Sequence, residues 1–281
     1  MIDLTNDKAV ILPESINYAD FAGRENIVVI SPHPDDDAIA AGGAIRLHAD
    51  HNEPVFTIYL TTGANTPAAG RRSTATITSQ RQEESVMAMK ILGTSAGFFL
   101  HYESGEIIKT TIEDVAQDIF AILMVVKPKR IYLPSPFESH LTHLAATSRT
   151  LEALRRVPDL TPEMRGYSVW SEIFATPDEL ETIDISEVID AKKRAMRTHE
   201  SEIKFKPYDT ATIGKNHFDA IFNDPHADSK TQYSETFLKM DGLALRPELE
   251  LDVYARNLAL KKLHDMYAEI LATQQANQNQ L

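Results

Sequence analysis

The chain has 281 residues, of which 43% are apolar and 25% charged, and its formal net charge is −13. This composition is ordinary for a globular protein with a sizeable hydrophobic core. The absence of cysteine excludes disulfides, cysteine-ligated zinc or iron–sulfur sites and a thiol nucleophile, so any metal must be bound by His, Asp or Glu. The acidic balance disfavours nucleic acid and membrane surfaces as partners. We expect a cytoplasmic protein without a leader or a membrane-spanning segment.

The first part of the chain alternates predicted strands and helices. The β-branched run from Asn26 to Ser31 indicates a buried parallel strand, and the pair Gly42-Gly43 is expected to let the next helix lie close to the sheet. Residues 62–78 form a long Gly/Thr/Ser/Pro-rich loop, a candidate for substrate contacts. The alternation predicts an α/β fold, a three-layer, Rossmann-like, doubly wound and mostly parallel sheet. Predicted strands cover 26–31, 55–61, 97–102 and 130–133, and predicted helices cover 37–50, 80–92, 112–126 and 142–156.

The second part of the chain has a weaker pattern. We expect one more strand at 167–173 and a helix at 185–202. Residues 205–232 mix Pro, Asp, Asn, His and Lys without a clear period, so we expect a covering loop or cap there. A long helix at 248–272 is predicted to end in a polar, frayed tail. This helix could pack on a second copy of the chain, so the sequence is compatible with a homo-oligomer.

The first chemically informative motif is Pro32-His33-Pro34-Asp35-Asp36-Asp37, at the end of the first predicted strand. Three consecutive carboxylates beside an imidazole repel one another unless a cation or hydrogen bonds offset the charge, and a divalent metal would do so. His33 and Asp36 can turn inward across a tight turn, which leaves Asp35 free to face a water. The alternative is an acidic helix N-terminus, because Asp suits the N-cap and the first turn.

A second motif, Pro134-Ser-Pro-Phe-Glu-Ser-His140-Leu-Thr-His143, also follows a predicted strand. His140 and His143 could project to one side of the first helical turn, or they could be ordinary surface or capping histidines. The carboxyl ends of parallel strands meet at one edge of a sheet, so both motifs are expected there. Together they supply His, Asp and His with an open position, the pattern of a catalytic zinc.

These motifs resemble the LmbE-like (PIG-L) family of zinc-dependent N-acetylglucosaminyl deacetylases. Leu-Gly93 after Arg81-Gln-Glu-Glu84, Tyr167-Ser-Val-Trp170, Asp184-Ile-Ser186 and Lys193…His199-Glu-Ser201 add to the resemblance, which covers about residues 26–204 of one expected domain, 1–281. The resemblance implies one Zn²⁺ per chain, other divalent transition metals being able to replace it. The roles it implies are zinc ligands His33, Asp36 and His143, general base Asp35, and transition-state helper His140.

Two departures from the family pattern concern charge. Asp37 stands where the family usually has Glu, and it is expected either to accept substrate hydroxyls or only to cap the helix. Thr142 stands where the family usually has Asp, so a histidine of this motif lacks a carboxylate partner. We expect Glu138 to replace that carboxylate in part.

Three further side chains are weaker candidates for substrate binding. Arg71, in the long loop, could bind a sugar or an acidic aglycone, or it could be a solvated surface residue. Arg81 could also bind substrate, although an i,i+3 ion pair with Glu84 is the favoured interpretation. Trp170 could stack on a sugar ring, but a lone Trp is more often part of a core.

The sequence therefore predicts a hydrolase that removes an N-acetyl group from an amino sugar or amino-sugar conjugate by a zinc-activated water. The first alternative is a metal-dependent phosphoesterase, which commonly needs two ions and a cationic clamp. The second is a non-catalytic sugar-binding module on the same fold. Nucleotide binding is disfavoured because the first strand lacks G-x-G-x-x-G.

Overall fold

The computed structural model describes residues 2–6, 8–109, 112–243, 256–266 and 268. These residues contain an eight-stranded sheet with the order β1-β4-β3-β2-β5-β6-β8-β7. Its strands are β1 (Val10–Leu12), β2 (Ile27–Ser31), β3 (Val55–Thr61), β4 (Ala96–Tyr102), β5 (Arg130–Pro134), β6 (Glu163–Tyr167), β7 (Leu180–Asp184) and β8 (Ser234–Lys239).

The five central strands are parallel, and antiparallel pairing occurs at both ends of the sheet. β2 pairs with β3 on one side and with β5 on the other, both in parallel register. β1 pairs antiparallel with β4, and β8 pairs antiparallel with both β6 and β7. The chain thus winds outward from β2 in one direction and from β5 in the other, which confirms the predicted doubly wound α/β fold.

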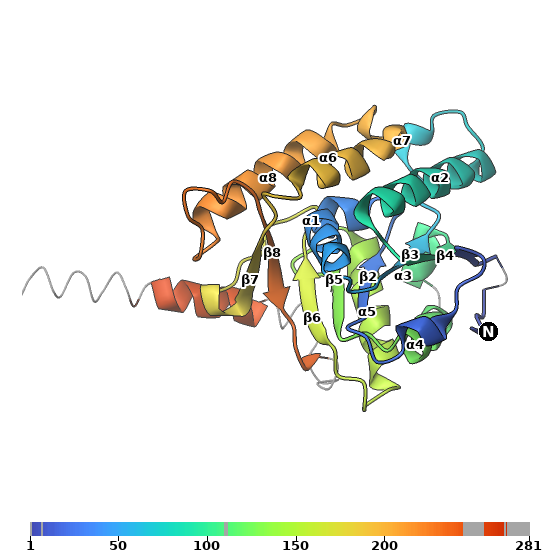
Figure 1. The fold of residues 1–281 in the computed structure, drawn as a ribbon, viewed down its shortest axis with the longest axis horizontal. Coiled ribbons are helices and arrows are strands. Elements are labelled where there is room, and N and C mark those ends of the chain that lie inside the picture. The colour runs from blue at the N-terminus through green and yellow to red at the C-terminus, as the bar shows by residue number, and fades with distance from the viewer. Residues whose placement is uncertain (1, 7, 110–111, 244–255, 267, 269–281) are drawn as a thin grey trace, which may run out of the picture.

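Helices cover both faces of this sheet (Figure 1). Because side chains alternate along a strand, Val28 and Ile30 of β2 face one core and Ile27 and Val29 face another. The α-helices are α1 (Asp36–Asp50), α2 (Thr74–Leu92), α3 (Ser104–Lys109), α4 (Ile112–Val126), α5 (Leu141–Arg155), α6 (Ile189–Thr198), α7 (Glu200–Ile203) and α8 (Tyr208–Phe222), and the 3-10 helices are η1 (Tyr18–Phe21), η2 (Pro67–Ala69) and η3 (Pro177–Glu179). The first core includes residues of α3, α4 and α5, and the second includes residues of α1, α2 and α6.

The predicted elements are confirmed from the first strand to α5, with boundaries that shift by a few residues. The largest difference there is α2, which begins at Thr74 inside the predicted loop 62–78, because Ser73 caps it through a hydrogen bond from the Thr76 amide. Gly43 is expected to bring α1 close to the sheet, but it contacts Ile185 instead. A Cβ on Gly43 would lie 2.4 Å from the Ile185 Cγ2 atom, so this close approach is to the chain just beyond β7 and not to the parallel strands.

The second half differs more from the prediction. The strand expected at 167–173 is wrong, since β6 ends at Tyr167. The segment 185–202 contains a turn at 186–188 after β7, and α6 and α7 follow it. The cap expected at 205–232 contains the helix α8, whose buried positions include Asp209, Asn216 and Asp219. Polar residues at buried positions hide a helix from any search for apolar periodicity.

The C-terminal prediction is only partly covered by the structure. Residues 256–266 are helical, as expected for part of the predicted helix 248–272. The rest of that helix and the tail 274–280 lie outside the described residues, apart from residue 268, which is also helical. Within the part of the chain that is described, no helix combines the length and the apolar character needed to cross a bilayer.

Candidate metal centre

The two predicted motifs lie at the point where the strand order reverses. β2 ends at Ser31, the turn after it carries His33, and Asp36 is the first residue of α1. His143 lies in the first turn of α5, after β5. β2 and β5 are neighbours whose chains leave in opposite directions along the sheet. A crevice opens at the carboxyl ends of the strands at such a reversal. The fold thereby brings together His33 and His143, which are 110 positions apart in sequence.

Three donor atoms converge there. His33 Nδ1 lies 3.0 Å from Asp36 Oδ2, His143 Nε2 lies 3.2 Å from the same oxygen, and the two nitrogens are 3.3 Å apart. A tetrahedral ion with bonds of about 2.0–2.1 Å separates neighbouring ligand atoms by roughly 3.3 Å, so the donors already have the required spacing. In the part of the chain that the structure describes, this is the one cluster of three or more such side chains suited to a metal ion. The residues fit one divalent ion.

Electrostatics within this cluster favour the ligand form of Asp36. Burial raises the pKa of Asp36, but the His143 and His33 side chains outweigh that effect and hold its pKa well below the usual range. Asp36 is therefore a carboxylate at neutral pH. Burial lowers the pKa of His143, yet the carboxylates of Asp36 and Glu138 together raise it to about 10. Without a metal, the charged form of His143 is therefore favoured at neutral pH.

Glu138 supports His143 from behind. Its Oε1 atom lies 3.1 Å from His143 Nδ1 and accepts a 2.6 Å hydrogen bond from the Val169 amide, and its Oε2 accepts one from the Trp170 amide at 3.2 Å. Both Glu138 and His143 have fully buried side chains. A carboxylate on the far nitrogen of a ligating histidine fixes the ring orientation and strengthens its donor nitrogen. Glu138 thus gives His143 a carboxylate partner, which the Thr at position 142 cannot provide.

Asp35 lies outside the ligand set, on the wall of the adjacent cavity of about 190 Å³. The guanidinium of Arg81 holds it, with Nη2 2.9 Å from Asp35 Oδ1, and the same guanidinium reaches Glu202 and the Gly63 carbonyl. The expected ion pair between Arg81 and Glu84 is wrong, because Arg81 turns to these groups instead. Arg81 lines the cavity, but both of its Nη atoms are engaged by protein partners, and it orients Asp35.

Two other predicted substrate residues lie elsewhere. Asp37 is fully buried, accepts a 2.8 Å hydrogen bond from the Tyr59 hydroxyl, and does not line the cavity; its amide is bound by the Ser31 hydroxyl. Burial raises the pKa of Asp37 to about 7. In this structure Asp37 faces the Tyr59 hydroxyl, and its role as a substrate contact stays a prediction. Arg71 is exposed on the loop before α2 and does not line the cavity at the metal centre either.

His140 and Trp170 form another wall of the cavity. The two rings stack with centroids 5.9 Å apart, and the His140 ring lies 5.1 Å from that of His33. Burial, followed by the nearby His33 and His143, lowers the pKa of His140, so its neutral form dominates at pH 7. Trp170 is 45% exposed, so the expectation that it belongs to the core is wrong.

The structure adds two residues that the sequence reasoning left without a role. Glu202 lines the same cavity as Asp35 and shares Arg81 with it. His199 is 1% exposed, and neither ring nitrogen has a hydrogen-bond partner among the described residues. Burial lowers the pKa of His199 to about 4, so it is neutral beside the site. The sequence contained one indication of their importance. The stretch His199-Glu-Ser201, which ends next to Glu202, resembles the family.

The comparisons with known proteins agree with this geometry. Residues 28–154 match the family described as PIG-L: GlcNAc-PI de-N-acetylase. A probable N-acetyl-alpha-D-glucosaminyl L-malate deacetylase 2 of Bacillus cereus is 30% identical over 199 residues, covering 69% of this chain and 90% of that protein. The chain belongs to the PIG-L family.

Two further proteins place this PIG-L chain among deacetylases. The diacetylchitobiose deacetylase of Thermococcus kodakarensis is 29% identical over 193 residues, which are 65% of this chain and 72% of that protein. The structure of an N,N'-diacetylchitobiose deacetylase from Pyrococcus horikoshii, complexed with its inhibitor MPG, has a TM-score of 0.62 at 21% identity and covers 79% of this chain and 86% of that one. The latter shows the shared fold. His33, Asp36 and His143 all lie within the matched family segment, whereas α8 lies outside it.

Proposed function

We propose that this protein is a metal-dependent N-deacetylase that hydrolyses the acetamide of an amino sugar or amino-sugar conjugate, with Zn²⁺ as the ion. The observation that carries the proposal is the separation of roles within one cavity. Three donor atoms converge with the spacing of a tetrahedral ion, and Asp35 lines the cavity together with His33 and Asp36 but lies outside the donor set. The deacetylase relatives support the reaction class and the sugar substrate.

When bound, a zinc ion would lower the pKa of a water towards about 7 and polarise the acyl oxygen. Asp35 accepts the proton of the attacking water and returns it to the departing amine. Arg81 keeps the Asp35 carboxylate turned into the cavity through their 2.9 Å contact. The neutral His140 ring donates a hydrogen bond to the oxyanion that develops on the acyl oxygen. The amide and one water thus become acetate and a free amine.

The two alternatives are less well supported. A two-metal phosphoesterase requires ligands for ions about 4 Å apart, and the described residues contain one candidate cluster. Two cations line the cavity, Arg81 and Lys206. Arg81 is already bound by two carboxylates and is a poor phosphate clamp. A sugar-binding module would have no use for a carboxylate held beside a metal-ligand set. We also propose that residues 1–281 act as one domain, since a single sheet contains both early and late strands.

The decisive experiment separates metal binding from chemistry by replacing Asp35 with Asn. Asp35→Asn keeps the size of the side chain but cannot accept a proton, so bound metal should stay near one ion per chain while acetate release falls at least about 10²-fold. Asp50→Asn is a matched control, because this carboxylate lies at the other end of α1 and pairs with Arg46 at the surface. Full activity in Asp35→Asn would disprove its role as general base. Loss of metal would instead mean that Asp35 is a ligand.

A further inference from the structure

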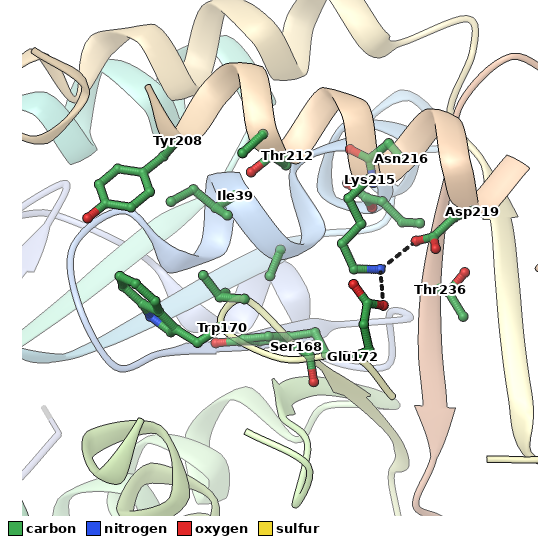
Figure 2. Close-up of a pocket in the computed structure, with 15 residues that line it drawn as sticks. Ile39, Ser168, Trp170, Glu172, Tyr208, Thr212, Lys215, Asn216, Asp219 and Thr236 are labelled. Carbon is green, nitrogen blue, oxygen red and sulfur yellow. Dashed lines mark hydrogen bonds and ion pairs between the residues drawn. The ribbon is translucent and has the colours of Figure 1, made fainter. Parts of the chain in front are cut away.

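A second cavity, of about 250 Å³, lies beside the metal-site cavity; we call it the α8 cavity because α8 forms one of its walls (Figure 2). The two cavities share Ile39, Val169, Trp170 and Tyr208 as lining residues. A complete small-molecule site usually has at least roughly 300 Å³, so each cavity has the size of one part of a divided site. A molecule that reacts at the metal centre can therefore extend into the α8 cavity.

The junction between the two cavities is aromatic. The rings of Trp170 and Tyr208 meet edge to face, with centroids 5.8 Å apart. Trp170 also stacks on His140, so this pair begins at the reacting centre and ends in the α8 cavity. Aromatic rings with a polar end suit ligands that present both C–H faces and hydroxyl groups, as sugar rings do. The junction is thus built to hold a linkage between two such rings.

Two residues that line the α8 cavity each contain a polar atom without a partner. Asn216 is 4% exposed, and its Nδ2 donates to the Ser234 carbonyl, but its Oδ1 atom is buried without a hydrogen-bond partner. The hydroxyl oxygen of Thr236, on β8, is buried in the same unpaired state. A buried polar atom without a partner costs about 1–3 kcal/mol. Both atoms are closed off from solvent, so a ligand hydroxyl would satisfy them once the Asn216 amide or the Thr236 hydroxyl turns towards the cavity.

The charges around the α8 cavity disfavour an anionic ligand. Lys215 contacts Asp219 at 2.8 Å and Glu172 at 3.7 Å, as Figure 2 shows. Glu235 is bound by the buried Lys192 at 2.6 Å. The lining thus contains three carboxylates and one lysine, and that lysine is already engaged. A ligand phosphate or carboxylate would meet net negative charge, whereas a neutral, hydroxyl-rich group would not.

From these observations we infer that the α8 cavity is a subsite for a second, uncharged sugar unit, and that the preferred substrate is a neutral N-acetylated disaccharide or short oligosaccharide. This inference rests on the proposed deacetylase function. The polar residues that α8 and β8 contribute to the α8 cavity lie outside the segment that matches the family, 28–154. The shared motifs therefore provide the reaction, and α8 and β8 provide the selectivity.

The first test fills the α8 cavity. Thr212 lines it on the half-buried side of α8, and Thr210 is an exposed residue of the same helix outside the lining. The ratio of kcat/KM for N,N'-diacetylchitobiose to that for N-acetylglucosamine should fall at least tenfold in Thr212→Trp and stay unchanged in Thr210→Trp. An unchanged ratio in Thr212→Trp, with acetate still released, would overturn the subsite and leave the proposed function intact. A wild-type preference for N-acetylglucosamine 1-phosphate over the disaccharide would overturn the charge argument.

The second test measures binding without turnover. In the metal-loaded Asp35→Asn protein, calorimetry should detect N,N'-diacetylchitobiose at least tenfold more tightly than N-acetylglucosamine. Adding Thr212→Trp should remove that advantage, and Thr236→Val, a nearly isosteric change, should reduce it severalfold. Failure of wild-type turnover alongside this binding pattern would refute the proposed reaction but support the subsite. Equal affinities for the two sugars in the Asp35→Asn protein would refute the subsite. Thermal unfolding of each variant verifies that it is folded.

Discussion

Glu138 offers the sharpest test of how the metal centre is supported. The Glu138→Gln substitution removes a buried negative charge and one acceptor oxygen from a carboxylate that serves His143 and two backbone amides. If the amide oxygen keeps its place near His143 and the Val169 amide, the new NH₂ group faces the Trp170 N–H, which then loses its acceptor. If the amide flips, the NH₂ group faces His143 instead. Either orientation breaks at least one charge-assisted hydrogen bond.

The expected loss is about 10- to 100-fold in zinc affinity, the usual effect of removing a carboxylate behind a ligating histidine. This corresponds to about 1.4–2.8 kcal/mol. The same substitution lowers the pKa of His143 in the metal-free protein, because Glu138 is one of the carboxylates that raise it. Proton competition then weakens, but the ion carries two charges and the proton one, so the loss of metal affinity prevails.

The assay is competition with a chromophoric zinc chelator between pH 6 and pH 9. Glu152→Gln is the matched control, because Glu152 lies on α5 but pairs with Arg155 and Arg156 near the helix end. The control should bind zinc like the wild type, and Glu138→Gln should bind it more weakly with a shallower pH dependence. A Glu138→Gln affinity within twofold of wild type across this range would refute the proposed support of His143. Thermal unfolding in excess chelator separates any loss of folding from loss of metal.

Three other predictions concern the site and its packing. The zinc affinity of the wild type should rise from pH 6 to pH 9 by at most about tenfold per pH unit, because the pKa of His143 is raised to about 10 and only its neutral ring binds an ion. Calorimetry in buffers of different ionisation enthalpy should show that one proton is released on binding, and binding without proton release would contradict the prediction. His140→Ala should retain zinc and lower the maximal rate about 10²-fold or more. Because the pKa of His140 is lowered, any fall in the rate above pH 7 should persist in this variant and belong to another group. Gly43→Ala should destabilise the fold by about 1–3 kcal/mol through a clash with Ile185, whereas Gly105→Ala, in open space, should not; equal denaturation midpoints would contradict the close packing.

The sequence by itself determined the central sheet and the location of the site. Runs such as Ile27–Ser31 and Val55–Thr61 are buried on both faces, so their apolar composition is visible without any knowledge of their neighbours. The motifs after β2 and β5 follow from the same reasoning, since parallel strands end at one edge. His33, Asp36 and His143 could therefore be predicted as one cluster, and the structure places their donor atoms together.

The tertiary structure alone decided which partners surround that cluster. Arg81 could pair locally with Glu84, but packing of α2 against the β2–α1 turn offers it Asp35 instead. Glu138 reaches His143 because the chain after β6 donates two amides to its carboxylate. α8 buries the polar residues Asn216 and Asp219, so its buried face does not show as an apolar pattern in the sequence. The cavity that α8 lines becomes visible only when the helix is placed beside β8. Local periodicity records which face of an element is buried, whereas these contacts join segments far apart in the chain and depend on how the elements pack.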